Sequence, residues 1–453
     1  MNDIVSQQRT FFYTHKTKAI KFRLEQLNKL ELLLKSNEDQ LNQAIYEDFK
    51  KSEFDTYVTE LALLYQDIKE AKRNVRKWAK IKRVGTNMLN FPARSYIIPE
   101  PLGVCLVIGA WNYPYQLTLA PVIAAITAGN TVVIKPSEMS PKTSALMTRL
   151  INNTFDANYL KVVEGGIPET TELLKNKFDK IFFTGSPQVG KIIYQAAAKN
   201  LTPVTLELGG KSPAIITADS NLKMTVKRMV WAKFINAGQT CIAPDYVLVH
   251  KSVENKLLEL LKLEIEKESF SIENGNYTQI INDRNLDRLS NLFSSDNVFV
   301  GGNIDAFNRT IEPTVLQNVK FSDDVMKEEI FGPILPVISY QNIEEVITYV
   351  NDNPKPLSCY IFTNSNQIKK KILNEISFGG GAVNDAVMHI ANSKLPFGGV
   401  GNSGIGSYHG EAGFKSFSHY KSILDKSNLM ELSLKYFPHS KGKLSWIQRF
   451  MSF

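Results

Sequence analysis

The stretch Lys180-Ile181-Phe182-Phe183-Thr184-Gly185-Ser186-Pro187 carries the clearest fold signal of the chain. The apolar run Ile181–Phe183 is typical of a buried strand, and a turn of small residues follows it. A helix is predicted from Pro187 onward. Free N–H groups and the dipole at such a helix start favour a phosphate. Many strand–helix turns have a similar sequence pattern, so the stretch by itself predicts only a strand, a turn and a helix that could bind a nucleotide.

Apolar runs and helical stretches alternate on both sides of this turn. The predicted strands are Val104–Ile108, Thr131–Ile134, Lys161–Val163, Ile181–Phe183 and Val204–Leu206. The predicted helices between them are Leu117–Ala128, Lys142–Ile151, Glu169–Leu174 and Val189–Lys199. This order predicts a parallel sheet covered by helices, with ligands bound beyond the carboxyl ends of its strands.

A second alternation follows and predicts a second α/β domain. Its strands are expected at Ala214–Ile216, Tyr246–Val249, Val315–Leu316, Ile334–Ile338 and Cys359–Phe362. Its helices are expected near residues 221–236, 252–267, 343–351 and 366–375. The fold class is therefore α/β.

Residues 4–80 are predicted to be amphipathic surface helices. Leu27, Leu30 and Leu34 share one helix face, and charged residues fill the other. No obvious chemistry is expected of these helices. Arg94–Pro99 is an extended segment interrupted by proline, which suits the edge of a sheet.

The composition is that of an ordinary globular protein of several domains. Of 453 residues, 43% are hydrophobic and 22% are charged, and the net charge is +8. The excess of Lys and Arg is spread along the chain, which argues against a nucleic-acid partner. Three cysteines, no visible signal peptide and no apolar run of bilayer length predict a reducing, cytoplasmic location.

The stretch Phe234–Pro244 contains the most reactive candidate group, Cys241. Gly238 permits a tight turn and Pro244 ends any helix, so the thiol is expected on an ordered loop. Taken alone, a free cysteine is more often a small buried hydrophobe than a nucleophile.

Several polar residues follow the predicted strands. Glu207 lies between apolar residues at a strand end, where burial would raise its pKa toward that of a general base. An ion pair with Lys211 or another basic residue is the alternative. Glu329 is a similar case. Asn112 could donate to an oxyanion or could simply serve a turn, and Lys135 could reach a nucleotide or could simply be a surface lysine.

The six histidines form no close pair with each other or with a cysteine at metal-ligand spacing. No metal site is predicted.

Together these motifs resemble the aldehyde dehydrogenase superfamily, over nearly the whole chain. The motifs that carry the resemblance are Trp111-Asn112-Tyr113-Pro114, Phe183-Thr184-Gly185-Ser186, Leu206-Glu207-Leu208-Gly209-Gly210-Lys211, Gly238-Gln239-Thr240-Cys241 and Glu329-Ile330-Phe331-Gly332-Pro333. Asn384–His389 and Pro396–Gly404 are closer still to the class 3 branch of fatty and aromatic aldehyde dehydrogenases.

The resemblance implies a Rossmann-like cofactor domain, an α/β catalytic domain and a small β oligomerisation arm. The implied boundaries are 1–82 for helices on the cofactor domain, 83–101 for part of the arm and 102–207 for the NAD(P)-binding domain. The catalytic domain would span 208–392. Residues 393–424 would combine the arm with a glycine-rich segment near the active site, and 425–453 would be a tail. A homodimer is expected.

The resemblance also implies roles for individual residues. Cys241 would be the nucleophile, Glu207 the base that activates water, and Asn112 a donor to the oxyanion. Gly238 would leave space for the nicotinamide. The implied cofactor residues are Trp111, Lys135, Glu138, Gly185, Ser186, Val189, Glu329 and Phe331. The implied walls of an apolar substrate pocket are Tyr113, Phe234, Thr240, Ile242, Ile390 and Ala391.

The expected reaction is oxidation of medium- or long-chain aliphatic or aromatic aldehydes to acids through a thiohemiacetal and a thioester. NAD is the expected cofactor, because the Glu138 carboxylate would repel a 2′-phosphate, with NADP as the alternative. The competing hypothesis is a cofactor-free cysteine acyltransferase or thioesterase. For the basic amphipathic tail, packing on the protein or a partner subunit is favoured over membrane association.

Overall fold

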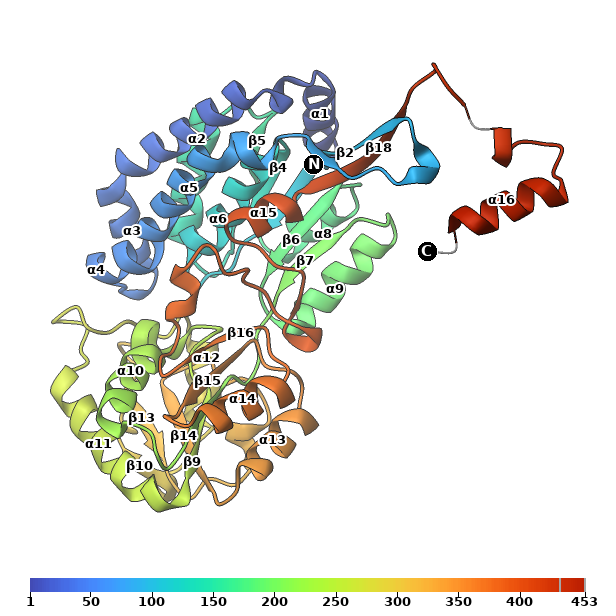
Figure 1. Cartoon of the computed structure of the whole chain (residues 1–453). Helices are drawn as coiled ribbons and strands as arrows, with labels where there is room; N and C mark the ends of the chain where they lie inside the picture. Colours follow the sequence, from blue (N-terminus) through green and yellow to red (C-terminus); the bar gives the residue numbers. More distant parts are fainter. Residues whose placement is uncertain (432, 452–453) are drawn as a thin grey trace. The chain divides into compact units, whose positions relative to one another are not determined.

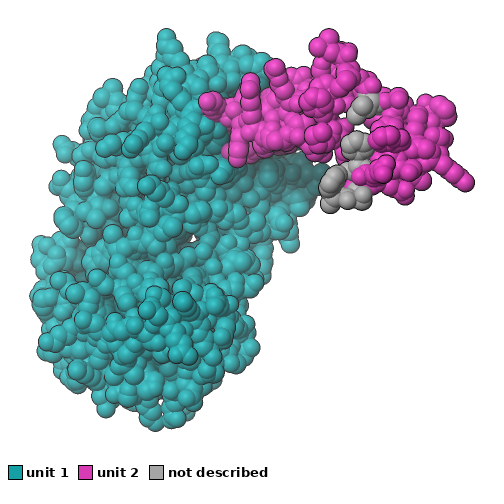
Figure 2. All heavy atoms as spheres, viewed as in Figure 1, with its two compact units in different colours: residues 1–78, 101–418 teal, residues 79–100, 419–453 magenta. Residues whose placement is uncertain are grey.

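The computed structural model describes residues 1–431 and 433–451. These residues form two compact units, coloured separately in Figure 2: residues 1–78 with 101–418, and residues 79–100 with 419–453. The predicted segment 393–424 is thus divided at Ser418, and most of it belongs to the larger unit.

The first domain of the larger unit is built on a six-stranded sheet with the order β17-β7-β6-β3-β4-β5. Its strands are β3 (Val104–Ile108), β4 (Thr131–Lys135), β5 (Leu160–Val162), β6 (Lys180–Thr184), β7 (Val204–Glu207) and β17 (Gly404–Ile405). The five strands β3 to β7 are parallel, as predicted. The added strand, β17, is antiparallel and pairs Gly404 with Glu207.

Helices cover both faces of this sheet (Figure 1). They are α6 (Pro114–Ala128), α7 (Pro141–Thr154), α8 (Ile167–Leu174) and α9 (Pro187–Ala198). Alternate side chains of β3, Val104, Leu106 and Ile108, share one apolar cluster with Ile193 of α9. A helix with apolar residues on all sides must be buried on all sides, and α6 is buried along nearly its whole length.

The amino-terminal helices pack against this domain. They are α1 (Asn2–Tyr13), α2 (Ile20–Lys35), α3 (Glu38–Phe49), α4 (Glu53–Thr56) and α5 (Ala62–Trp78), with a π-helical turn at Tyr57–Leu61. Leu27, Leu30 and Leu34 are buried, as their spacing predicts. The helices α2 and α5 pack on α6, so that α6 lies between them and the sheet.

The second domain contains a seven-stranded sheet with the order β10-β13-β14-β9-β8-β15-β16. Its strands are β8 (Pro213–Ile216), β9 (Tyr246–His250), β10 (Val298–Val300), β13 (Thr314–Leu316), β14 (Ile334–Tyr340), β15 (Ser358–Phe362) and β16 (Gly380–Val383). Its helices are α10 (Leu222–Phe234), α11 (Glu254–Glu268), α12 (Asp283–Ser290), α13 (Ile343–Asp352) and α14 (Asn366–Glu375). A short ribbon, β11 (Ile304–Asp305) with β12 (Thr310–Ile311), and α15 (Gly410–Ser416) complete the larger unit.

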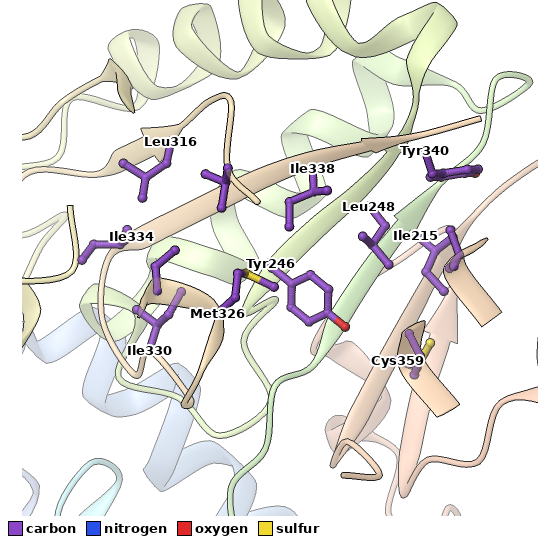
Figure 3. Packing of buried hydrophobic residues seen from close by; sticks show 14 of the residues in the cluster. Ile215, Tyr246, Leu248, Leu316, Met326, Ile330, Ile334, Ile338, Tyr340 and Cys359 are labelled. Atoms are coloured by element: carbon purple, nitrogen blue, oxygen red, sulfur yellow. The ribbon is translucent and has the colours of Figure 1, made fainter. Parts of the chain in front are cut away.

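One face of this second sheet carries a large apolar core. Figure 3 shows Ile215, Tyr246, Leu248 and Ile338, which come from β8, β9 and β14, among its members. Met326, from the loop before β14, packs into the same cluster. This core fixes the loop segment that reaches the site described below.

The smaller unit is a three-stranded sheet with the order β1-β2-β18. Its elements are β1 (Lys82–Val84), β2 (Ala93–Pro101), β18 (Ser418–Lys426) and α16 (Lys441–Met451). Most of the β18 side chains are exposed. Among the described residues, no helix combines the length and the apolar character needed to cross a bilayer.

Candidate active site

The carboxyl edge of the six-stranded sheet brings several predicted site residues into one row. Glu207 pairs with Thr184 across β7 and β6. Ile108 of β3 pairs with Phe183 on one side and with Lys135 on the other. The strand order reverses between β3 and β6: β4 and β5 are added on one side of β3, and β6 and β7 on the other. Parallel sheets bind ligands at such a switch point.

A cleft of about 1290 Å³ opens at this edge and is lined by residues of both domains. The predicted site residues that line it are Trp111, Asn112, Lys135, Glu138, Gly185, Ser186, Val189, Glu207, Cys241, Glu329 and Phe331. The fold therefore brings every predicted catalytic and cofactor residue to one cavity.

The loop that presents Cys241 has an unusual backbone. Asn236, Ala237 and Gly238 are three successive residues with positive φ, at 55°, 51° and 71°. Two of them are not glycine, so surrounding contacts must hold this conformation in place. A Cβ on Gly238 would lie 2.2 Å from the Gly332 carbonyl oxygen. The expectation that Gly238 leaves space for a nicotinamide is therefore wrong, because the backbone of Gly332 fills that side.

The Cys241 thiol is half-buried. Burial raises its pKa, and the nearby Glu329 and Glu207 carboxylates raise it further. The resting group is thus a neutral thiol, which needs a base before it can attack.

Glu207 is the most isolated carboxyl group of the site. Its residue is 3% exposed, and neither carboxylate oxygen has a hydrogen-bond partner. Burial raises its pKa well above the ordinary value. The alternative of an ion pair with Lys211 is wrong, because the Lys211 Nζ contacts Asp245 at 2.5 Å instead.

The Asn112 amide is held between two loops. The side-chain Nδ2 of Asn112 donates to the Gln239 carbonyl oxygen at 3.0 Å, and the main-chain carbonyl oxygen of Asn112 accepts from Asn236 Nδ2 at 2.9 Å. An amide has two N–H donors, so one remains for a ligand.

Lys135 and Glu138 form a pair at the end of β4. The Nζ of Lys135 donates to the Pro136 carbonyl oxygen at 2.6 Å and lies 3.5 Å from Glu138 Oε2. Burial lowers the pKa of Lys135, while Glu138 opposes that change. Lys135 is buried, so the alternative that it is a surface lysine is wrong.

The turn before α9 has the geometry of a helix cap. Ser186 Oγ accepts from the Val189 N–H at 3.3 Å. A Cβ on Gly185 would lie 2.6 Å from the Phe183 ring, so this turn requires glycine for close packing. The Thr184 hydroxyl is buried without a partner.

Glu329 approaches the site from the second domain. A Cβ on Gly209 would lie 1.9 Å from Glu329 Oε2, so the carboxylate rests directly on the glycine backbone. Burial and the Asp245 carboxylate raise the pKa of Glu329 to about 8, although a hydrogen bond with the Gly210 backbone acts in the opposite direction. Phe331, two residues on, packs edge-on against Trp111 with ring centroids 5.5 Å apart.

The predicted substrate-pocket residues do not line this cleft. The Phe234 ring is buried against Phe270, with centroids 5.6 Å apart, and Ile242 is also buried. Ile390 and Ala391 line a separate cavity of about 10 Å³. Tyr113 and Thr240 contact each other through their hydroxyl groups, at 2.6 Å.

Sequence reasoning missed the residues that fix Glu329. Lys211 Nζ donates to the carbonyl oxygens of Val325 and Glu328, at 2.9 and 2.8 Å. Arg288, from α12, donates to the Ile330 carbonyl oxygen at 2.7 Å. Leu286 and Leu289, with Asn282 as a cap, were the available signal for α12.

Within the described residues, no group of three His, Cys, Asp or Glu side chains could hold a metal ion.

Comparison with known proteins identifies the family. The model of the "Aldehyde dehydrogenase family" matches residues 1–423. The chain is 47% identical to 4,4'-diaponeurosporen-aldehyde dehydrogenase of Staphylococcus aureus, over 98% of this chain and 97% of that protein. It is 43% identical to the "Aldehyde dehydrogenase, dimeric NADP-preferring" of Rattus norvegicus, over 98% of this chain and 99% of that protein. Family 3 member A2 of Mus musculus is 42% identical, over 99% and 93%.

A solved structure supports the same assignment. The substrate-bound state of Staphylococcus aureus AldH superposes with a TM-score of 0.97 and 46% identity, over 99% of this chain and 98% of that one. This match confirms the predicted fold class, and the family 3 relative confirms the class 3 resemblance. The chain therefore belongs to the aldehyde dehydrogenase family and is an enzyme that oxidises aldehydes.

Proposed function

We propose that this enzyme oxidises medium- or long-chain aliphatic or aromatic aldehydes to carboxylic acids through a thiohemiacetal and a thioester on Cys241. The observation that carries the proposal is the pairing, in one cleft, of the Cys241 thiol with a buried Glu207 carboxyl group that has no hydrogen-bond partner. A buried acid without a partner is costly for stability, and functional sites are where such groups persist.

A dinucleotide fits the other end of the cleft. The unpartnered Thr184 hydroxyl and the capped start of α9 suit a pyrophosphate, and the Lys135–Glu138 pair suits a ribose. Glu329 is the proposed contact to the second ribose, and Trp111 and Phe331 the apolar contacts near the nicotinamide. When bound, the nicotinamide would accept the hydride that leaves the aldehyde carbon.

The residues of the chain have distinct proposed roles in the chemistry. Glu207, or a water beside it, takes the Cys241 proton, because a thiol with a raised pKa does not ionise by itself. The second Asn112 N–H donates to the oxyanion that forms when the thiolate adds to the aldehyde. Glu207 then takes a proton from the water that hydrolyses the thioester.

The proposed substrate class rests on apolar surroundings. Phe234 and Ile242 belong to the same stretch as Cys241 and are buried apolar residues, although neither lines the cleft. The stretch Phe234–Pro244 contains no arginine or lysine that could bind a substrate carboxylate. The Staphylococcus aureus relative is named for 4,4'-diaponeurosporen-aldehyde. We expect the physiological aldehyde of this enzyme to be apolar as well.

NAD is the proposed preferred cofactor, with NADP as the second. The Glu138 side chain is half exposed at the cleft rim, where a carboxylate favours a 2′-hydroxyl and repels a 2′-phosphate. The rat relative is named NADP-preferring, so the two cofactors must be compared directly. Strict dependence on NADP would refute this part of the proposal.

We further propose a cytoplasmic homodimer. The three cysteines are all free, which suits a reducing compartment, and the rat relative is named dimeric.

The test is NADH formation across an aldehyde chain-length series, with Cys241→Ala and Glu207→Gln beside the parent enzyme. Cys241→Ala should lose activity. Glu207→Gln should give a burst of NADH of about one equivalent per active site without sustained turnover, because hydrolysis stalls. Full activity of Cys241→Ala, or normal turnover of Glu207→Gln, would refute the mechanism.

A further inference from the structure

A buried ion pair in the amino-terminal helices lies outside the chemistry described so far. Lys51 Nζ contacts Glu60 Oε1 at 2.8 Å, and the two side chains are 1% and 0% exposed. Taking two charges out of water costs several kcal/mol unless further contacts compensate. The other contacts of Lys51 and Glu60 must therefore compensate for this cost.

The second oxygen of Glu60 binds the start of α6. Its Oε2 accepts from the Tyr115 N–H at 2.7 Å and from the Gln116 N–H at 3.2 Å. The residue before the helix, Tyr113, provides no side-chain cap. Glu60 thus acts as the cap from a different helix, at the end where the dipole favours an anion. The capped residues, Tyr115 and Gln116, lie three and four residues after Asn112 in the chain.

Lys51 reaches the nucleophile loop through an aromatic ring. Its Nζ lies 4.2 Å from the centroid of the Tyr113 ring, which is a cation–π distance. The Tyr113 hydroxyl lies 2.6 Å from Thr240 Oγ1. Thr240 is the residue before Cys241, so one continuous set of contacts joins Glu60, Lys51, Tyr113 and Thr240.

A second connection runs from the same helical region to the residue before Thr240. The Phe49 carbonyl oxygen accepts from the Gln279 N–H at 2.9 Å. The Gln279 carbonyl oxygen accepts from Gln239 Nε2 at 3.0 Å, and Gln239 Oε1 accepts from the Ile281 N–H at 3.0 Å. Gln239 is also the residue whose carbonyl oxygen binds Asn112.

We infer that Lys51 and Glu60 are positioning residues for the nucleophile loop: they hold Tyr113 and the start of α6, and thereby fix Thr240 and Asn112 relative to Cys241. The inference rests on the proposed function of Cys241. The left-handed turn at residues 236–238 gives it a physical reason, because a strained loop keeps one geometry only when its neighbours hold it. The connection through Gln239 provides one anchor and the Lys51–Glu60 pair the other.

The experiment compares Lys51→Met, Glu60→Gln and the double variant with the parent. Three quantities are measured: the rate of the NADH burst with benzaldehyde and NAD, the rate of Cys241 alkylation by iodoacetamide, and Tm. Each single variant should slow the burst about tenfold or more, because small misplacements of reacting groups are costly. Alkylation should become about threefold faster, because a loosened loop exposes the thiol.

The double variant separates positioning from stability. It removes both buried charges of the pair, so its Tm should recover toward that of the parent. Its burst should stay slow, because the ammonium over Tyr113 and the charged cap of α6 are both gone. If the rates of the NADH burst and of Cys241 alkylation return to the parent values together with Tm, the pair only stabilises the fold and the inference is wrong.

The pair Arg9–Asp179 provides a matched control. Arg9 Nη1 contacts Asp179 Oδ2 at 2.8 Å, and that oxygen also accepts from the Val104 N–H at 2.8 Å, at the opposite edge of the sheet. Arg9→Met and Asp179→Asn should lower Tm without changing either rate. If they change both rates as much as Lys51→Met does, the inference is wrong.

Tyr113→Phe covers the case in which the charge variants fail to fold. It keeps the ring beside Lys51 and removes only the contact with Thr240, so it should also slow the burst and speed alkylation. Unchanged rates in this variant contradict the inference. If the parent forms no NADH with any aldehyde, the proposed function fails, and the alkylation rates still decide whether the pair positions Cys241.

Discussion

At the scale of single residues, burial shifts the pKa of both groups to which we assign the chemistry. It raises the pKa of the Glu207 carboxyl group and of the Cys241 thiol, so ionising either group is costly in the folded protein. Their shared cleft is the reason to assign them chemistry rather than packing.

Glu207→Gln should stabilise the fold at neutral pH. The folded pKa of Glu207 lies well above its unfolded value. Its favourable contribution is therefore present below the unfolded pKa of about 4.5 and is lost as pH rises toward the folded pKa. At pH 8 the amide, which cannot ionise, should raise the free energy of unfolding by about 1–3 kcal/mol, because each unit by which the folded pKa of Glu207 exceeds the unfolded one costs the parent about 1.4 kcal/mol.

Thermal unfolding of parent and variant at pH 8 and pH 4 measures this difference. The gain should shrink toward zero at pH 4, where both folded and unfolded parent carry a neutral carboxyl group. An equal gain at both pH values would mean that ionisation of Glu207 is not its cause.

Gly209→Ala should weaken cofactor binding. The added Cβ would lie 1.9 Å from Glu329 Oε2, so the carboxylate must move away from its position. The KM for NAD should rise about tenfold, the effect of losing one charge-assisted hydrogen bond. Gly166→Ala is the control, because its Cβ would meet no atom closer than 3.8 Å. An unchanged KM in Gly209→Ala would argue against a cofactor role for Glu329.

The sequence identified the residues of the site better than their surroundings. Glu207 and Lys135 could be found because each ends a strand, and Cys241 because it follows Gly238 on a loop. Lys51 and Glu60 could not, because a charged residue in a loop or on a surface helix is normally solvated, and only the packing of α6 shows that this pair is buried.

At the scale of elements, the start of α9 has two functions that can be measured separately. Ser186 caps the helix, and its turn lines the cleft. Ser186→Ala should lower the free energy of unfolding by about 1 kcal/mol. It should also raise the KM for the cofactor, because the same turn is the proposed pyrophosphate site.

Ser365→Ala is the matched control. Ser365 caps α14 by accepting from the Ile368 N–H at 3.2 Å, and it does not line the cleft. Both variants should lose similar stability, but only Ser186→Ala should change KM. A change in KM in both variants would show that lost stability, rather than a lost contact, is responsible.

The regular elements were predictable, and the glycine-rich ones were not. The strands from β3 to β7 follow their apolar runs within about a residue or two at each end, the usual uncertainty of such boundaries. No strand is predicted at Gly380 and Gly381, because glycine is poor in strands. They form β16 because a Cβ on Gly381 would lie 2.0 Å from the Cys359 carbonyl oxygen, so close strand packing selects glycine there.

At the scale of the whole molecule, the smaller unit does not bury a core of its own within one chain. Its three strands leave most β18 side chains exposed, and the tail exposes Leu429 at 96% and Phe437 at 83%. Sheets of this size need a second layer for stability. A partner subunit is the expected second layer.

A chain ending at Ser427 should therefore form a weaker dimer. Among the described residues, Ser427 is the last one whose backbone N–H donates to the loop before β2, at the Pro92 carbonyl oxygen. The three-stranded sheet should therefore survive the truncation. Loss of the exposed apolar tail residues should raise the dimer dissociation constant at least about tenfold, or 1.4 kcal/mol, because burying even one such side chain contributes about that much. Sedimentation velocity over a dilution series measures it.

Flotation with anionic vesicles distinguishes the competing explanation for the same residues. Because α16 is only 11 residues long and Pro438 interrupts the segment before it, the tail offers only a short apolar face to a bilayer. Neither the full chain nor the truncated one should float. If the full chain floats and the truncated chain does not, and if truncation leaves the dimer dissociation constant unchanged, the exposed side chains contact a membrane surface rather than a partner subunit.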